Sequence, residues 1–421
     1  MSFDIALSGI QAINESLNTT SHNIANAGTY GYKASRANFS SLVAGSQVTG
    51  VMVGSTSQNI GKTGGILNTG RALDASINGS GFFIAKDAQS GQTQYTRVGI
   101  FDTSKDGFLI DASGRKVQGY AITPGTSTLG ALGDIKIATG SIPAVASDKM
   151  AYIGNLSADW PEKNAWVAPD PTAVPPIEVD SNTFSASRTT TLYDTLGGQR
   201  ILTQYFMRSP NGSTDGIAGS VDVHYVLDGV EVGTALTMTF DATTDGHMLT
   251  PDATTNGTNT LGLAALAPGK NGAVLKDLVI DYTGTTGFAG EATVSTNRAE
   301  GYPAGNFNRI ELGNDGSIIA AYSNGEKQAV GRLALATFAD EGALTSVSDT
   351  SWTASANSGE PLVNAPGVGT AGKINVTSLE GSNVDITSEL VGLMTSQRNY
   401  QANSKVIQTE STMLQSLMQA I

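Results

Sequence analysis

The chain has 421 residues, which allows two or three domains at the usual size of roughly 150 residues each. Charged residues make up 14% of it, and the net charge is −13. Such an acidic chain repels phosphate backbones, so nucleic-acid binding is not expected. No stretch approaches the roughly 18 consecutive apolar residues of a membrane span, so none is expected. Cysteine is absent, which excludes disulfides, thiol catalysis and thiolate metal sites.

Apolar side chains recur every seven residues near the N-terminus. Two columns share this spacing: Phe3, Ile10, Leu17 and Ile24 in one, and Ala6, Ile13, Thr20 and Ala27 in the other. This heptad pattern predicts a helix of about 25 residues, with Gly28 as its C-cap. The segment has no basic region followed by an apolar core, so a cleavable secretory signal is not expected.

A second heptad pattern closes the chain and predicts another helix. Its column contains Ile386, Leu393, Tyr400, Ile407, Leu414 and Ile421, with Leu390, Leu417 and Met418 on the same face. The preceding segment 382–385 supplies capping side chains, and Asp385 and Glu389 suit the positive end of the helix dipole.

The two apolar stripes allow two interpretations. Each stripe could cover the globular core of its own chain, as amphipathic helices commonly do. Packing between molecules is favoured, because both helices lie at the ends of the chain, beside glycine-rich sequence and with few other helices to contact. The predicted polymerisation interface consists of Phe3, Ile10, Ile13, Leu17, Ile24, Leu390, Leu393, Tyr400, Ile407, Leu414 and Leu417.

Between the ends, the pattern changes to short strands separated by turn signals. Hairpin turns are predicted at Asp106-Gly107, Asn211-Gly212, Asp228-Gly229, Asp315-Gly316 and Asn324-Gly325. Strands are predicted at 81–85, 236–240 and 332–338, and the proline-rich segment 160–176 is typical of a connector. The predicted fold is multidomain and mainly β, with long α-helices at both termini.

No motif predicts catalysis, a cofactor or a metal. Residues 102–107 match the opening of a calcium loop, but Ser113 replaces the bidentate glutamate and Lys105 opposes a cation, so a hairpin turn is favoured. Residues 61–63 lack the first glycine of a phosphate loop. His22, His224 and His247 have no partner at metal-ligand spacing. The sequence does not exclude a catalytic pair of carboxylates, because residues that are distant in the sequence can lie close together in the fold. No such site is indicated, and an enzyme is not expected.

The segment Asn23–Lys33 resembles the N-terminal signature of the bacterial flagellar axial proteins, the rod, hook and hook-associated subunits. Residues 65–67, 79–83, 95–101, 389–391 and 397–403 also resemble this family. The positions that carry the signature at the two ends are Asn23, Ala25, Asn26, Gly31, Lys33, Gln397, Arg398, Tyr400 and Asn403.

Within that family, residues 193–197, 322–325 and 380–385 are similar to the hook subunits. The resemblance implies a structural, non-enzymatic subunit that assembles itself into a short curved tube, a flexible universal joint transmitting torque from rod to filament. A distal rod subunit is the alternative within the family. Outside it, a secreted β-rich adhesin or hydrolase acting through residues 146–298 is the alternative.

The resemblance also implies that the N- and C-terminal helices pair as a coiled-coil-like inner domain, followed by nested β domains. Residues 1–27 and 383–421 would form the inner polymerisation domain, 28–70 an extended connector and 361–382 a second connector. Residues 71–145 and 299–360 would form a β domain from both flanks, and 146–298 an outer middle β domain. The implied partners are further copies of the chain, the hook cap, the distal rod, the hook-filament junction proteins and the flagellar type III export apparatus. The implied location is the extracellular flagellum.

Overall fold

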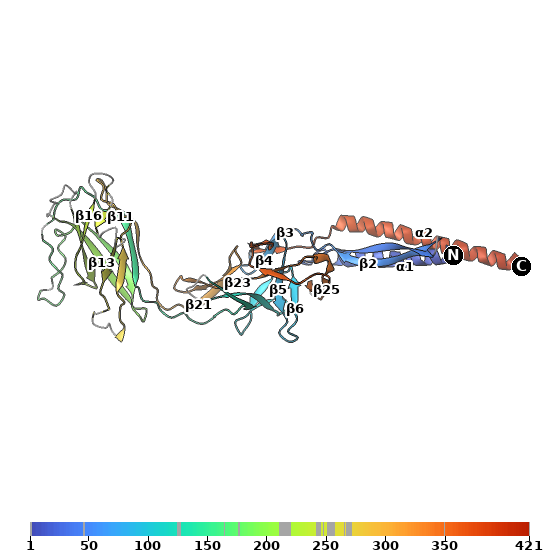
Figure 1. The fold of residues 1–421 in the computed structure, drawn as a ribbon, viewed down its shortest axis with the longest axis horizontal. Helices are drawn as coiled ribbons and strands as arrows, with labels where there is room; N and C mark the ends of the chain where they lie inside the picture. Colours follow the sequence, from blue (N-terminus) through green and yellow to red (C-terminus); the bar gives the residue numbers. More distant parts are fainter. Residues whose placement is uncertain are drawn as a thin grey trace. The chain divides into compact units, whose positions relative to one another are not determined.

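The computed structural model describes residues 2–44, 47–123, 128–163, 165–175, 177–209, 220–240, 246, 248–250, 257–264, 266, 272–348 and 350–420. Two long helices lie at the ends of the chain, and strands occupy the sequence between them (Figure 1). The chain divides into two compact units. The terminal unit contains residues 1–139, 308–321 and 327–421, and the central unit contains residues 140–307 and 322–326.

The two helices belong to the terminal unit and lie against each other. They are α1 (Ser2–Ala25) and α2 (Ile386–Ala420). An antiparallel hairpin of β1 (Ser35–Ala44) and β2 (Gln47–Gln58) packs on α1 as well. The predicted pairing of the terminal helices is therefore confirmed. Neither helix combines the length and the apolar character that crossing a lipid bilayer would require, among the residues described.

The ends of the helices follow from local hydrogen bonds. The Asp385 carboxylate accepts from the backbone N–H groups of Thr387 and Ser388, which confirms it as a cap of α2. The prediction of Gly28 as the C-cap of α1 is wrong. The helix ends at Ala25, after which both the backbone N–H and the side-chain amide of Asn26 donate to the carbonyl of His22, and the left-handed glycine is Gly31, with φ of 67°.

The rest of the terminal unit is β structure. Two small antiparallel sheets pair β3 (Ile66–Asn68) with β29 (Ser378–Glu380), and β4 (Ala75–Asn78) with β28 (Lys373–Val376). The largest sheet of the described chain has thirteen strands, which come from both flanks of the sequence. They are β5 (Phe82–Lys86), β6 (Thr93–Thr96), β7 (Phe101–Thr103), β8 (Leu109–Asp111), β9 (Lys116–Ile122), β10 (Leu129–Asp134), β21 (Phe307–Leu312), β22 (Ser317–Tyr322), β23 (Lys327–Leu333), β24 (Leu335–Thr337), β25 (Thr345–Val347), β26 (Ser351–Thr353) and β27 (Leu362–Asn364).

An aromatic cluster forms one core of the terminal unit. Phe82 lies 5.6 Å from Trp352 and 6.0 Å from Phe338 between ring centroids, and Tyr95 packs edge-on against Phe338. Trp352 is buried, and its indole N–H donates to the Gln58 side chain at 2.7 Å. The root of the β1–β2 hairpin is thereby fixed to the β domain of the same unit.

The central unit contains two sheets that share one core. The first sheet holds β12 (Ala186–Tyr193), β13 (Gln199–Arg208), β14 (Val221–Leu227), β15 (Val230–Glu231), β16 (Leu236–Phe240) and β17 (Met248–Thr250). The second holds β11 (Lys149–Asn155), β18 (Thr258–Leu261), β19 (Leu278–Asp281) and β20 (Thr293–Ala299). Tyr225 and Tyr282 share a hydrogen bond of 2.9 Å inside the core, and Tyr282 donates to Gln204. Burial raises the pKa of Tyr152 and that of Tyr225 to about 12.

Four predicted hairpin turns are confirmed. Asp106-Gly107 joins β7 to β8, Asp228-Gly229 joins β14 to β15, Asp315-Gly316 joins β21 to β22, and Asn324-Gly325 joins β22 to β23. Each glycine has a positive φ, the conformation that these turns require. Asn211-Gly212, His247 and Ile421 lie outside the described residues. The β1–β2 hairpin was not predicted within 28–70, because its serine- and threonine-rich strands lack a clear apolar alternation.

Candidate assembly surface

The seam between α1 and α2 is made of small and polar side chains at heptad spacing. We call this set the polar ladder: Gly9, Ser16 and Asn23 on α1 face Asn403, Ser396 and Glu389 on α2. Each step of seven residues forward on α1 matches a step of seven residues back on α2, so the helices run antiparallel in a fixed register.

Three contacts define the polar ladder. The hydroxyl oxygens of Ser16 and Ser396 lie 3.4 Å apart. The Asn23 amide donates to the Glu389 carboxylate at 2.9 Å. A Cβ added at Gly9 would lie 2.9 Å from the side-chain nitrogen of Asn403, so the helices approach closely there because Gly9 has no side chain.

The predicted interface residues lie mainly outside this seam. The exposed fractions are 41% for Phe3, 45% for Leu390, 39% for Tyr400, 56% for Leu414 and 60% for Leu417. The half-buried members are Ile10, Ile13, Leu17, Ile24, Leu393 and Ile407. One chain alone therefore leaves much of both apolar columns uncovered, and their role as a polymerisation interface stays a prediction.

Further exposed apolar side chains lie on the two helices and on the β1–β2 hairpin, and the predicted interface does not include them. They are Ile5 and Leu7 on α1, Val391, Met394, Val406 and Met413 on α2, and Phe39, Leu42, Val43 and Met52 on the hairpin. A soluble monomer rarely exposes so many large apolar side chains together, so these elements have the character of an interface. Within the hairpin, the available signal was large apolar residues among serine and threonine.

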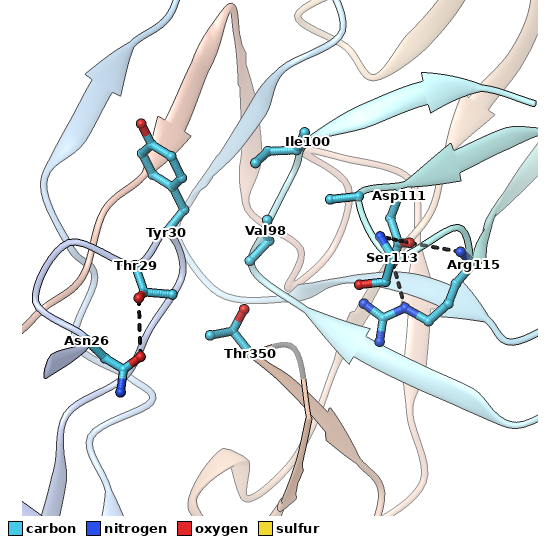
Figure 2. A pocket seen from close by; sticks show the side chains of 10 residues that line it. Asn26, Thr29, Tyr30, Val98, Ile100, Asp111, Ser113, Arg115 and Thr350 are labelled. Atoms are coloured by element: carbon cyan, nitrogen blue, oxygen red, sulfur yellow. Dashed lines mark hydrogen bonds and ion pairs between the residues drawn. The ribbon is translucent and has the colours of Figure 1, made fainter. Parts of the chain in front are cut away.

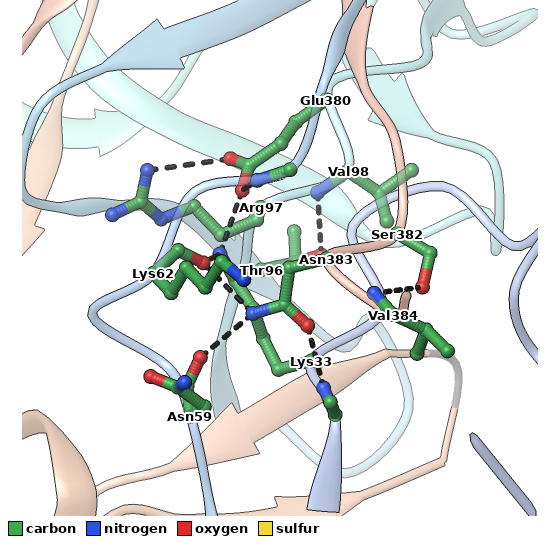
Figure 3. Close-up of polar contacts among 12 residues, drawn as sticks. Lys33, Asn59, Lys62, Thr96, Arg97, Val98, Glu380, Ser382, Asn383 and Val384 are labelled. Carbon is green, nitrogen blue, oxygen red and sulfur yellow. Dashed lines mark hydrogen bonds and ion pairs between the residues drawn. The ribbon is translucent and has the colours of Figure 1, made fainter. Parts of the chain in front are cut away.

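A buried charged cluster holds the base of the helices to the β domain (Figure 3). The Lys33 ammonium donates to one oxygen of Glu380 at 2.6 Å, and Arg97 lies 3.4 Å from the other oxygen. The backbone N–H of Gly64 also donates to Glu380, at 3.0 Å. The three charged side chains are at most 1% exposed. Burial lowers the pKa of Lys33, and the hydrogen bond to Glu380 opposes that effect.

Asn383 and Gly31 complete this junction. The Asn383 amide donates to the carbonyls of Asn59 and Lys62, and its oxygen accepts from the backbone N–H of Ala34 at 2.7 Å (Figure 3). The backbone N–H of Gly31 donates to the carbonyl of Glu380 at 2.8 Å. Segments more than 300 residues apart are thus joined by directional bonds.

The residues that carry the family signature divide into two groups. Those with contacts inside the chain are Asn23, Asn26, Gly31, Lys33 and Asn403. Those that are exposed are Ala25, Gln397, Arg398 and Tyr400. The second group is available to a neighbouring molecule.

A groove of about 370 Å³ opens beside the loop that follows α1 (Figure 2). Asn26, Thr29 and Tyr30 line one side, and Val98 and Ile100 lie across from them. Its charged groups already bind each other, since Asp111 accepts from the Arg115 guanidinium at 2.7 Å and from two backbone N–H groups. This arrangement stabilises a turn, and it presents no nucleophile beside a base.

Two of the three histidines, His22 and His224, lie within the described residues. His22 lies on α1 and His224 on β14, and His224 pairs with Glu231 at 2.9 Å. Across the described part of the chain, no group of three or more histidine, cysteine, aspartate or glutamate side chains is arranged to hold a metal ion.

Comparisons with known proteins agree with this geometry. Residues 377–420 match the family model for the flagellar basal body rod FlgEFG protein C-terminal region. Residues 156–302 match that for the flagellar basal body protein FlaE D2 domain, and residues 76–148 match that for the flagellar hook protein FlgE/F/G D1 domain.

Relatives extend the similarity over nearly the whole chain. The chain is 30% identical to the flagellar hook protein FlgE of Salmonella typhimurium over 425 residues, and to that of Escherichia coli K12 over 423 residues, covering 99% of each protein. The crystal structure of Helicobacter pylori flagellar hook protein FlgE2 has a similar fold, with a TM-score of 0.51, 13% identity, and coverage of 75% of this chain and 100% of that one. The chain therefore belongs to the flagellar hook protein FlgE family, a family of non-enzymatic structural proteins of the flagellum.

Proposed function

We propose that the chain assembles with further copies of itself into the curved tube of the flagellar hook, which acts as a flexible universal joint and transmits torque from rod to filament. The observation that supports this most is the composition of the helix seam. Because α1 and α2 meet through the polar ladder, the apolar columns stay available to neighbouring subunits.

The energetic argument concerns those columns. Fully burying one leucine or isoleucine side chain contributes roughly 1.5–3 kcal/mol, so burying an exposed half contributes about 1 kcal/mol. The predicted interface has eleven exposed or half-buried apolar residues, so covering it offers on the order of 10 kcal/mol per subunit before ordering costs are subtracted.

The proposal assigns the parts of the chain as follows. Residues 1–27 and 383–421 form the inner polymerisation domain, with connectors at 28–70 and 361–382. Residues 71–145 with 299–360 form the β domain, and 146–298 the outer one. The low charged fraction of 14% suits contacts that exchange as the tube bends, because few ion pairs would fix one arrangement.

The partners follow from the same role. They are the hook cap, the distal rod, the hook-filament junction proteins and the flagellar type III export apparatus. The assembled location is the extracellular part of the flagellum.

Electron microscopy of the purified protein tests the proposal. Full-length protein is expected to form tubes, whereas variants lacking 1–27 or 383–421 are expected to stay unassembled, with circular dichroism confirming that their β structure is retained. Tubes formed by both truncated variants would contradict the proposal. Straight tubes from the full-length protein would favour a distal rod subunit instead.

A further inference from the structure

The helix α2 extends beyond the part of α1 that covers it. In the register of the polar ladder, Ser2 of α1 lies opposite Glu410 of α2. The remaining residues of α2, which we call the overhang, are 411–420. At 1.5 Å per residue, the overhang is about 15 Å long. Figure 1 shows α2 continuing past the start of α1.

The face of α2 that carries the polar ladder changes its composition in the overhang. Leu414, Leu417 and Met418 follow Glu410 by four, seven and eight residues, so they continue the face that meets α1 earlier in the helix. Their exposed fractions are 56%, 60% and 73%. The overhang contains no charged residue.

A complementary surface is present on α1 but cannot be reached within one chain. The apolar column of Phe3, Ile10 and Leu17 lies beside the seam, and Phe3 and Leu7 are each 41% exposed. The overhang lies past the described start of α1, so its apolar face does not meet this column in the same copy. Two surfaces that match and cannot meet in one molecule can meet between two molecules.

We propose that the overhang of one subunit docks, through Leu414, Leu417 and Met418, on the Phe3–Ile10–Leu17 column of a second copy. This contact rests on the proposed function, since it requires that the chain polymerises. It joins one patch to a different patch, so each subunit gives one contact and receives another. A chain of such heterologous contacts forms an open helical assembly when the rotation between successive subunits does not close a ring. An open tube requires this kind of contact.

The absence of cysteine makes a cross-linking test direct. Subunits carrying Leu414→Cys, Leu417→Cys or Met418→Cys are mixed with subunits carrying Phe3→Cys or Ile10→Cys, assembled and oxidised. We expect at least one pair to give a two-chain product on a non-reducing gel, far above the yield with Gln415→Cys, which lies on another side of the helix.

A control pair reports on oxidation itself. Ser16→Cys with Ser396→Cys in one chain places the two sulfurs where hydroxyls lie 3.4 Å apart, so it is expected to form a disulfide within the monomer. If this control oxidises fully while every pair between overhang and column stays uncross-linked in assembled tubes, the docking proposal is wrong.

A second test uses charge. The double substitution Leu414→Asp and Leu417→Asp is expected to raise the critical concentration for assembly at least tenfold, whereas Gln415→Asp with Gln419→Asp places the same charge on the other face and leaves it within about twofold. Normal assembly of the leucine variant, together with loss of assembly on deleting 383–421, would overturn the docking contact alone. Tubes formed by both terminal truncations would overturn the proposed function as well.

Discussion

Replacing Glu380 by glutamine tests whether the buried charged cluster stabilises the terminal unit. The substitution keeps the size of the side chain and one acceptor oxygen, but removes the carboxylate that is bonded to both Lys33 and Arg97. Removing one partner of a buried ion pair costs about 3–5 kcal/mol, because the remaining charge is left without compensation. Since glutamine still accepts one hydrogen bond, we expect a cost near the lower value, about 3 kcal/mol.

Tryptophan fluorescence can follow this unit alone. Of the three tryptophans, Trp352 is buried in the terminal unit, while Trp160 and Trp166 belong to the central unit. In a background with the latter two replaced by phenylalanine, urea unfolding reports on the terminal unit. A loss of about 3 kcal/mol lowers the midpoint by roughly 1–3 M for typical urea slopes.

Two controls decide the interpretation. Glu360→Gln removes an exposed carboxylate from the same unit and is expected to change stability by less than about 0.5 kcal/mol. Adding Lys33→Met to Glu380→Gln is expected to cost less than the sum of the single substitutions, because the two side chains interact directly. A midpoint for Glu380→Gln equal to that of Glu360→Gln would refute the assigned role of the cluster.

Three further expectations concern pH and backbone conformation. Burial raises the pKa of Tyr152 and Tyr225 from 10.0 to about 12, so their stabilisation of the central unit is complete below about pH 10 and is lost as the pH rises through 12. Tyrosinate absorbance should therefore show these two side chains ionising only near pH 12, and their titration near pH 10 would contradict the prediction. Hydrogen bonds from the side chain and backbone of Ser388 and the backbone of Thr387 lower the pKa of Asp385, so this cap stabilises α2 above the ordinary pKa of an aspartate and loses its effect as the pH falls through the lowered value. Asp385→Ala should therefore speed amide exchange in the first turn of α2 at neutral pH but not at a pH below the lowered pKa. Equal exchange rates for the variant and the unaltered protein at neutral pH would refute this. Gly31→Ala places a Cβ 2.8 Å from a methyl group of Val98 at a φ of 67°, and should lower the free energy of unfolding measured in urea by about 1–3 kcal/mol. The Cβ of Gly28→Ala meets nothing within 4 Å, so this variant should be nearly as stable as the unaltered protein. Equal losses of stability in the two variants would contradict the argument from backbone strain.

Local chemistry accounts for what the sequence predicted well. The terminal helices follow from long heptad patterns, and the four confirmed turns follow from asparagine or aspartate before glycine, which needs no distant partner. The cap of α2 at Asp385 is likewise local. The family was found from short segments at both ends, where residue identity is specific.

Long-range contacts account for what the sequence did not predict. Lys33 and Arg97 meet Glu380 across 347 and 283 residues, and no pattern near any of them indicates the pairing. Heptad reasoning selects apolar residues, so it assigned Ile10 and Leu17 to the predicted interface between molecules and gave no role to Gly9 and Ser16. Only the partner helix shows that small polar side chains make the intramolecular seam.

The helix α1 carries two sets of contact residues, the polar ladder and the apolar column, and both recur every seven residues. Gly9, Ser16 and Asn23 each stand directly before a member of the apolar column, Ile10, Leu17 or Ile24. Neighbouring residues project about 100° apart around a helix, so the polar ladder contacts α2 of the same subunit while the apolar column stays available for a neighbouring subunit. A substitution in one set can therefore change the contact within the subunit or the contact between subunits without altering the other. Inserting a single residue between Ile10 and Ser16 would turn the start of α1 by about 100° relative to the rest of the helix, and would place Ile10 where Gly9 now lies against α2.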